Sequence, residues 1–309
     1  MEGDDNVLKK REHIFSNNVG DATMTVYNVF QGVQLVYHTV HMDQFDLNYT
    51  AEGNYIEIHY CREGRIEQQF EGEYFYLMPG DLSIARRMEV VRDYHFPLCH
   101  YHGISIGINM DMVSDIFLKM LNEMQVQPFE IVEKLCGENN WYTVRSEQDI
   151  EHIFTELYSV PDNMKEGYFK VKILELFLTL NGKKKERQQI TIEKFSKQQV
   201  QLANQVAAYL LEHMNQQITI TELAKRFHVS DTYIKTSFKG VYGVPIMSYM
   251  RIQIMQAAAQ LLIHTEQPIA EIAYEFGYNN TSKFAAAFQK IMGDTPSEYR
   301  KEHTKYRSK

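Results

Sequence analysis

The sequence predicts an α+β protein: an N-terminal antiparallel β-barrel, then helices, then an all-α unit. Three observations carry this prediction. Residues 24–110 form short runs rich in β-branched and aromatic residues and punctuated by glycine, which is typical of small barrels and sandwiches. From Asp111 the apolar period becomes helical. Near the C-terminus one helical pattern is written twice, at residues 220–251 and 269–300.

The β-rich half begins after a polar stretch, residues 1–20, which we expect to be a loosely packed lead-in. The segment YCREGRIEQQFEGEYFYLMPGDL, from Tyr60 to Leu82, predicts a hairpin and then a strand that ends in the turn Pro79-Gly80-Asp81. No helical segment interrupts these runs, so neighbouring strands are expected to pair antiparallel.

Four helices are predicted between Asp111 and Leu180: one after Asp111, one from Pro128, one at residues 145–160 and one at residues 167–180. Four apolar residues recur at intervals of four in the first helix, and we expect them in the core: Met112, Ile116, Met120 and Met124. The helices either pack on the barrel or pair with another subunit. Packing is the simpler interpretation, and both remain open.

The repeated pattern predicts a short helix, a tight turn and a second helix in each copy. Apolar positions of the first copy recur in the second at offsets of 49 or 50, for example Phe227 as Phe276 and Phe238 as Phe288. Ser230, and Asn279 or Asn280, are suited to cap the second helices. Gly240 or Gly243 is suited to end the first of these helices, and Gly293 the second.

The stretch from about Val200 to Arg300 resembles the DNA-binding domain of AraC/XylS-type transcription regulators. The segment IAEIAYEFGYNNTSKFAAAFQKIMGDTPSEYR matches their signature nearly end to end. The resemblance implies two helix-turn-helix units joined by a long helix, Ile246 to His264, with the second helix of each unit in the DNA major groove. Where the family often carries arginine, this chain has Thr236, Ala286 and Ile254. A helical repeat that binds protein is the alternative interpretation.

The side chains expected to meet DNA lie on the two second helices. Lys235 is placed to reach a base, whereas Lys239 and Lys290 are better placed for phosphates. The full set is Thr232, Lys235, Thr236, Lys239, Asn280, Thr281, Ser282, Lys283 and Lys290. Asn280 either pairs with adenine or caps its own helix.

The first half is similar to the cupin-like effector domains that precede many AraC-type DNA-binding domains, on the strength of the PGD turn and the spacing from Tyr60 to Gly64. The resemblance implies that a small molecule binds in the mouth of the barrel. Candidate pocket residues are Tyr37, His38, Tyr55, His59, Arg62, Arg86, His95, His100 and His102.

Charge is divided unevenly along the chain. Residues 196–309 contain 13 Lys and Arg and nine Asp and Glu, a formal charge of +4. Because the whole chain carries −8, residues 1–195 carry −12. An acidic sensor joined to a mildly basic DNA-binding unit fits this asymmetry. The predicted domains are residues 1–180 for effector binding and dimerisation, 181–195 as a linker, and 196–309 for DNA binding.

Motifs of catalysis are missing from the sequence. It has no phosphate-binding glycine loop, no Gly-x-Ser-x-Gly and no paired-cysteine zinc motif. His100 and His102 form an HxH, but no histidine follows the PGD turn, which favours a polar strand face over a metal site. We therefore predict no enzyme activity, no cofactor and no metal. The alternative is a cupin-like metal-dependent enzyme that its C-terminal domain localises.

The expected partners are double-stranded DNA, an unidentified small-molecule effector, a second copy of the chain and RNA polymerase. An alternative partner of the N-terminal half is another protein in place of a small molecule, and that alternative stays open. No secretory signal or membrane-length apolar run is found, and the three cysteines are widely spaced. The sequence therefore predicts a cytoplasmic protein.

Overall fold

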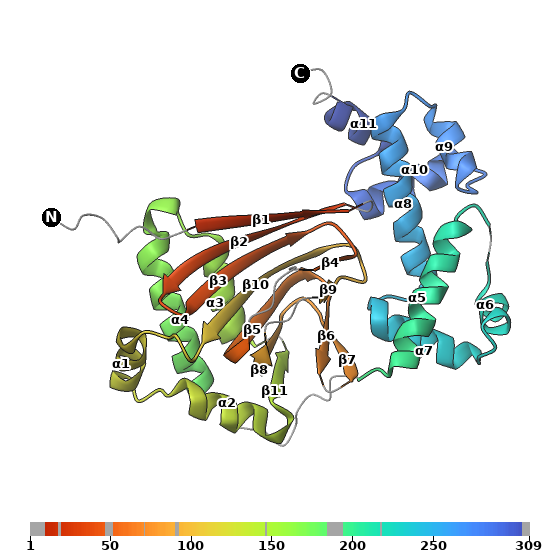
Figure 1. The fold of residues 1–309 in the computed structure, drawn as a ribbon. Helices are drawn as coiled ribbons and strands as arrows, with labels where there is room; N and C mark the ends of the chain where they lie inside the picture. The colour runs from red at the N-terminus through yellow and green to blue at the C-terminus, as the bar shows by residue number, and fades with distance from the viewer. Residues whose placement is uncertain are drawn as a thin grey trace. The chain divides into compact units, whose positions relative to one another are not determined.

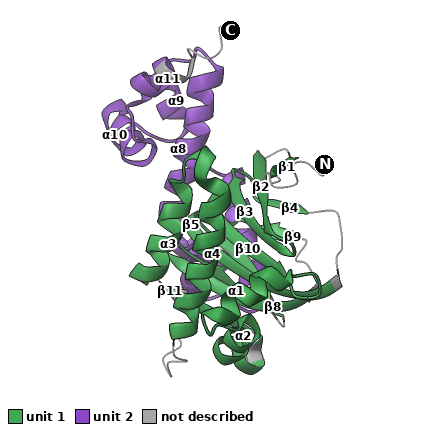
Figure 2. Ribbon diagram, turned by 90° about the vertical axis from the view of Figure 1, so that its left-hand side faces the viewer, with its two compact units in different colours: residues 1–194 green, residues 195–309 purple. Residues whose placement is uncertain are grey.

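The computed structural model describes residues 10–17, 20–46, 52–70, 72–89, 93–145, 147–183, 194–216 and 218–304. The chain divides into two compact units, residues 1–194 and 195–309 (Figure 2). Most of the predicted linker, residues 184–193, lies outside the described residues. Within the described ranges, no helix has both the length and the apolarity needed to cross a membrane.

Unit 1 begins with a largely antiparallel β region (Figure 1). Seven strands form one sheet in the order β1-β2-β3-β10-β5-β8-β11, and β4-β9 and β6-β7 form two smaller sheets. Every pair in these sheets is antiparallel. The strands are β1 Lys10–Ser16, β2 Asp21–Phe30, β3 Val33–Val40, β4 Gln44–Asp46, β5 Glu52–Gly64, β6 Ile66–Phe70, β7 Glu73–Leu77, β8 Asp81–Glu89, β9 Asp93–His95, β10 Tyr101–Asn109 and β11 Trp141–Arg145.

The predicted N-terminal antiparallel sheet followed by helices is confirmed, and it has more strands than the sequence indicated. Strand β1 lies where a loose lead-in was expected. Its side chains are exposed except that of Phe15, which is partly buried and stacks on Phe45. The strand therefore shows no apolar alternation in the sequence, and backbone pairing to β2 holds it. Strand β11, which was not predicted, precedes the predicted third helix and meets its range only at Arg145; the helix itself, α3, begins at Gln148.

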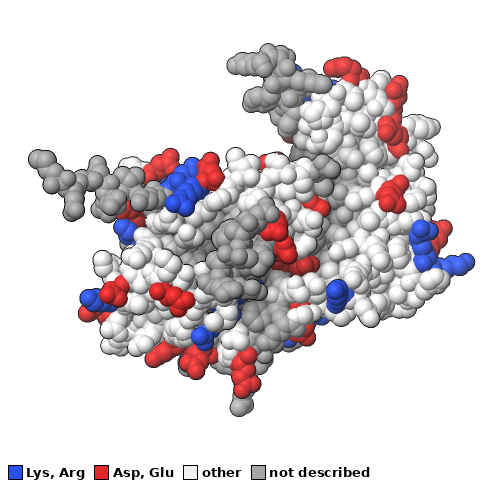
Figure 3. Space-filling view, viewed as in Figure 1, with Lys and Arg blue, Asp and Glu red and all other residues white. Residues whose placement is uncertain are grey.

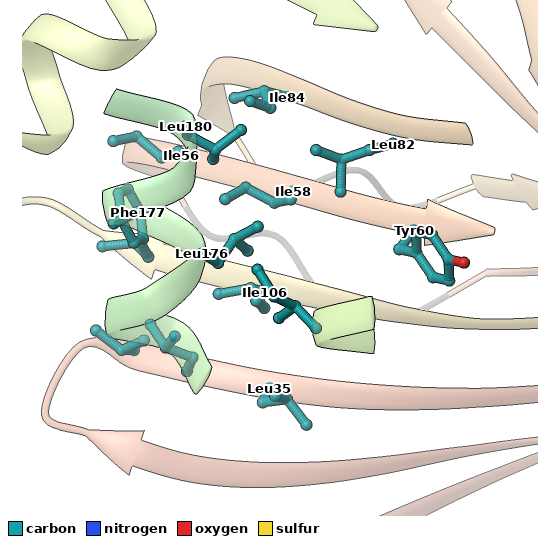
Figure 4. Close-up of a cluster of buried hydrophobic side chains, with 14 of the residues drawn as sticks. Leu35, Ile56, Ile58, Tyr60, Leu82, Ile84, Ile106, Leu176, Phe177 and Leu180 are labelled. Carbon is teal, nitrogen blue, oxygen red and sulfur yellow. The ribbon is translucent and has the colours of Figure 1, made fainter. Parts of the chain in front are cut away.

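The helices of unit 1 cover one face of the sheet, as the positions of α3 and α4 in Figure 2 show. They are α1 Asp115–Glu123, α2 Pro128–Cys136, α3 Gln148–Tyr158 and α4 Lys165–Gly182, with short 3₁₀ turns at Gly137–Asn139 and Asp162–Met164. Leu176, Phe177 and Leu180 of α4 point onto sheet residues that include Ile58 and Ile106 (Figure 4). The apolar stripe predicted for this helix is therefore buried.

The stripe predicted for the core of the first helix is wrong for three of its four residues. Met112, Ile116 and Met120 are exposed by 60%, 68% and 43%, whereas Met124 is partly buried against the core. Phe117 and Leu121 are the fully buried residues of α1. Phe117, the residue after Ile116, determines which face of the helix turns inward, because its ring packs against Phe30 and Phe177.

A second cluster of buried residues fills the opposite face of the sheet, beneath the two small sheets. It is built from aromatic and aliphatic side chains such as Phe75, Tyr94, Phe96 and Tyr101. Because strand residues alternate between faces, β2, β3, β5 and β10 contribute to both clusters. These four strands are therefore buried on both of their faces.

Unit 2 is entirely helical among its described residues (Figure 1). Its helices are α5 Lys197–Glu212, α6 Ile220–Arg226, α7 Asp231–Tyr242, α8 Ile246–His264, α9 Ile269–Glu275, α10 Thr281–Met292 and α11 Pro296–Thr304. Helix α8 lies between two helix pairs, α6–α7 and α9–α10, and packs against members of both. Its bounds are those predicted for the long connecting helix.

Candidate functional site

The first helix pair is fixed at each of its joints by a local hydrogen bond. Thr219 and Glu222 form a capping box at the start of α6. His228 takes a left-handed φ of 55° in the turn, and Ser230 caps α7 by accepting the N–H of Tyr233 at 3.2 Å. Capping and the burial of Ile234 therefore orient the first turn of α7 rigidly.

The second helix pair repeats this construction. Gly277, with φ of 77°, occupies the turn position that His228 occupies in the first pair. The Oδ1 atom of Asn280 accepts the N–H of Lys283 at 3.0 Å and caps α10, and Phe284 and Phe288 are fully buried. Of the two roles considered for Asn280, the structure assigns its side-chain oxygen to the cap.

All nine residues predicted to meet DNA are exposed: Thr232, Lys235, Thr236, Lys239, Asn280, Thr281, Ser282, Lys283 and Lys290. Thr236 is engaged within its own helix, because its hydroxyl donates to the carbonyl of Thr232 at 3.0 Å. The first turns of α7 and α10 therefore present a short row of hydroxyl, amide and ammonium groups to solvent. Such groups hydrogen-bond to base edges and phosphates.

Two exposed tyrosines on the helix pairs were missed by the sequence interpretation. Tyr233, in the first turn of α7, is 38% exposed, and Tyr274 on α9 is 71% exposed. Each lies outside the apolar stripe of its helix, which is the signal that would have identified it. On the face seen in Figure 3, basic side chains do not gather into one large patch over unit 2, in keeping with its modest excess of positive charge.

The nine predicted pocket residues do not lie together in unit 1. His38 and His59 are buried on the face opposite the helices. Tyr37, Arg62 and Arg86 contact residues of the helices, Tyr55 accepts a hydrogen bond from Asn109, and His95 is exposed on β9. His100 and His102 lie at the start of β10. Three separate groups therefore replace the single predicted pocket.

The buried group is a polar network inside unit 1. The Nε2 atom of His38 lies 2.8 Å from the hydroxyl of Ser105, and the rings of His38 and His59 are 6.5 Å apart. Glu57 lies 3.7 Å from His59 and 2.7 Å from Arg87. The Nδ1 atoms of both histidines are buried without a hydrogen-bond partner among the described residues. Unpaired polar atoms in an interior are costly and indicate a place where a polar ligand would be stabilised.

Protonation in this network follows from its burial. Burial and the neighbouring His59 lower the pKa of His38 to about 3. Burial opposes ionisation of Glu57, but His59 and Arg87 outweigh it and lower the pKa of that carboxyl. At neutral pH the network therefore contains a neutral His38 beside an ionised Glu57–Arg87 pair.

The group on the helix side is used for packing. The hydroxyl of Tyr37 donates to the carbonyl of Leu157 at 2.6 Å, and the guanidinium of Arg62 lies 4.2 Å from the centre of the Tyr158 ring. Arg86 donates to Asn54 at 3.1 Å and covers Phe129. These side chains attach the helices to the sheet, which leaves them little freedom to receive a ligand.

The third group contains a histidine that was not predicted. His41, directly after β3, joins His100 and His102, and one nitrogen from each ring lies within 4.8 Å of the other two. Glu63 of β5 lies 3.6 Å from His100 and 3.4 Å from His102. Burial and the neighbouring His100 lower the pKa of His102. His41 could not be recognised from the sequence because about 60 residues separate it from the HxH.

Comparison with known proteins covers mainly unit 2. The family described as "Helix-turn-helix domain" matches residues 223–302, which include most of α6 and all of α7 to α10. Regulatory protein SoxS of Escherichia coli is 33% identical over 93 residues, 30% of this chain and 87% of SoxS. The uncharacterized HTH-type transcriptional regulator YdiP of Escherichia coli is 33% identical over 101 residues, 33% of each chain.

A solved structure, the C-terminal domain of the response regulator AraT from Geobacillus stearothermophilus, is 32% identical, covers 33% of this chain and 84% of that domain, and gives a TM-score of 0.32. The chain spans about a third of the length of YdiP and of the MmsAB operon regulatory protein of Pseudomonas aeruginosa. The AraC/XylS resemblance predicted from the sequence is confirmed. With its capped helix pairs and its similarity to most of SoxS, the chain belongs to the AraC-type family of helix-turn-helix transcription regulators.

Proposed function

We propose that this protein is a sequence-specific DNA-binding transcription regulator whose N-terminal unit senses a small molecule. The observation that carries the proposal is the duplicated helix pair, in which capping leaves the first turns of α7 and α10 exposed and polar. In this proposal the two pairs are helix-turn-helix units, and α7 and α10 are the recognition helices.

Reading of DNA is assigned to particular side chains. Lys235 and Tyr233 of α7 reach base edges. The N-terminal end of α10 lies in the major groove, where the residues nearest the bases are Asn280, Thr281, Ser282 and Lys283. Lys239 and Lys290, in the later turns, bind phosphates. The two helices enter successive major grooves about 34 Å apart on one face of the duplex.

Sensing is assigned to unit 1, which we propose to be a cupin-like barrel. The support is the buried network of His38, His59 and Ser105 with its two unpartnered nitrogens. A small molecule that carries hydroxyl or carboxylate groups would satisfy these nitrogens. Of the nine residues first considered, His38 and His59 are therefore the strongest candidates for contact with the effector.

Assembly as a homodimer is proposed through α4. Met164 lies just before this helix, and Val171 and Leu178 follow at intervals of seven residues; the three side chains are exposed by 53%, 59% and 48%. Residues seven apart fall on nearly the same side of a helix, so they form an apolar line. Two subunits would bring two mildly basic DNA-binding units to one operator and so neutralise more phosphates than one unit can. RNA polymerase is the proposed further partner.

The proposal is tested by selecting sequences from a random duplex pool with the full chain and measuring affinity at several salt concentrations. A recovered consensus with a salt-dependent affinity supports it. Equal binding to all duplexes, or none at all, would reject it. For the sensor, the melting temperature of the full chain is screened against sugars, amino acids and siderophores, because a ligand of the native state raises it. A hit must lose its effect in His38→Gln.

A further inference from the structure

The three histidines at one edge of unit 1 form a constellation that the regulator function does not use. They come from separate strand ends: His41 follows β3, and His100 and His102 stand at the start of β10. Strands β3, β10 and β5 are neighbours in the sheet, and His102 is paired across it with Thr39 on one side and Glu63 on the other. The sheet therefore brings three imidazoles together, with the Glu63 carboxylate beside two of them, His100 and His102.

The geometry suits coordination better than hydrogen bonding. Glu63 Oε2 lies 3.6 Å from His100 Nε2 and 3.4 Å from His102 Nδ1, both longer than an ordinary N–H···O bond. Ligand atoms that share one tetrahedral zinc ion, at Zn–N distances of about 2.0–2.1 Å, stand about 3.3 Å apart. The imidazole nitrogens already lie within 4.8 Å of one another.

A second observation concerns His102 itself. Its Nε2 atom is buried and has no hydrogen-bond partner among the described residues, while its Nδ1 atom faces Glu63. A buried ring nitrogen without a hydrogen-bond partner is unusual in a protein interior. It leaves one nitrogen of His102 free to bind a ligand that the described residues do not supply.

The backbone beneath the cluster is closely packed. A Cβ atom on Gly64 would lie 1.9 Å from the carbonyl oxygen of His100, and a Cβ on Gly20 would lie 1.9 Å from that of His41. Glycine is therefore required opposite both histidines. The main chain at His41 and at His100 is therefore packed directly against a neighbouring segment.

We propose that His41, His100 and His102 bind a divalent transition-metal ion of the zinc class, with Glu63 as the fourth ligand. Imidazole and carboxylate donors suit such ions. This arrangement is not the HxH and PG-turn set sought in the sequence, because its third imidazole comes from the end of β3. The site is independent of DNA binding, so either proposal can fail without the other.

The test uses the full chain without an affinity tag, freed of metal by a chelator. Zinc binding is measured by calorimetry, and cobalt binding by the visible absorption of a tetrahedral site. We expect one ion per chain, and at least a tenfold loss of affinity in His41→Gln, His100→Gln and His102→Gln. Glu63→Gln should lose about tenfold. Zinc should also raise the melting temperature of the wild type but not that of His100→Gln.

The matched control is His152→Gln. His152 is an exposed histidine 3.5 Å from Glu156, outside the cluster, and its loss should leave zinc affinity unchanged. Absence of stoichiometric binding, or equal weakening by His152→Gln and His100→Gln, would overturn the site. Unchanged affinity in Glu63→Gln would overturn the assignment of its carboxylate. Circular dichroism of each metal-free variant verifies that the sheet is intact, so that a loss of binding reflects lost ligands.

Discussion

Arg145, the last residue of β11, donates two hydrogen bonds to the carboxylate of Asp81, the first residue of β8, at 3.0 and 3.3 Å. The Asp81 side chain is fully buried, and its Oδ2 atom also accepts the N–H of Met78 at 3.0 Å. One carboxylate therefore holds the edge strand and closes the Pro79-Gly80 turn. A charge placed so deeply depends on its partner, because burial without one is costly.

Replacement of Arg145 by methionine should lower the free energy of unfolding by about 3 kcal/mol, since it removes the guanidinium that hydrogen-bonds the buried Asp81 and, among cations of the described residues, leaves only the electrostatic interaction with Arg65. Urea unfolding can be followed through the fluorescence of Trp141, the single tryptophan of the chain. The control is Lys170→Met, which removes a partly exposed pair with Glu166 and should cost less than about 1 kcal/mol. Equal losses in the two variants would contradict the assigned role of Asp81.

Acid should destabilise unit 1 through His38. The unfolded chain binds a proton at this residue below about pH 6.5, whereas the native protein does so only near the lowered pKa of about 3. The native state then holds fewer protons, so the free energy of unfolding falls as pH drops through this window, by at most about 1.4 kcal/mol per pH unit.

The comparison that isolates His38 is wild type against His38→Gln, unfolded in urea at several pH values between about 5 and 7. His59, Tyr94 and Tyr101 lie around the ring, and Glu57 is reached through His59; all four remain in the variant. We expect a shallower pH dependence in His38→Gln. Parallel curves would show that His38 does not control acid stability.

DNA binding should separate Lys235 from Lys290. Lys235→Ala removes a donor in the second turn of α7 and should weaken binding at a few base pairs, by roughly 1–3 kcal/mol. Lys290→Ala removes a late phosphate contact and should weaken binding to all sequences alike, with a flatter salt dependence. A set of mutated operators at several salt concentrations distinguishes the two effects. The opposite pattern would assign the base contact to Lys290 and the phosphate contact to Lys235. Unchanged binding in both variants would show that DNA binds to another face of unit 2.

Dimerisation should depend on the apolar line of α4. The double variant Val171→Asp, Leu178→Asp places charges on that line, and light scattering of the full chain should then report a monomer. Met120→Asp introduces the same charge at an exposed apolar position of α1 and should leave the dimer intact. A wild-type chain that is monomeric at micromolar concentration would defeat the prediction.

Periodic and capped elements were predictable from the sequence. The start of α7 follows from a local signal, because Ser230 caps the helix by its own conformation and hydrogen bonding. The buried stripe of α4 follows from spacing alone. In both cases the information lies within a few residues of the element it determines. The bounds of α8 were implied by the family resemblance.

What could not be predicted depends on distant partners. β11 is a strand because residues 81–85 lie beside it, and Phe117 turns the methionines of α1 outward because Phe177 is there to receive it. The same reason hid the approach of His41 to His100. The separation of Tyr37 and His38, by contrast, was predictable, because successive residues of a strand point to opposite faces. Pairing across the sheet is a long-range property, and local pattern does not contain it.

Helix α8 has a consequence for the promoter. Its 19 residues span about 28 Å as one continuous helix, and it packs against both helix pairs. In the proposed binding mode it would therefore hold the two recognition helices at a fixed separation. Five base pairs inserted between the two half-elements of an operator would turn the second half-element by about half a turn, since a full turn takes about 10 base pairs. Ten inserted pairs would restore its direction but put it out of reach. A regulator of this construction therefore constrains the spacing of its operator as well as the letters in it.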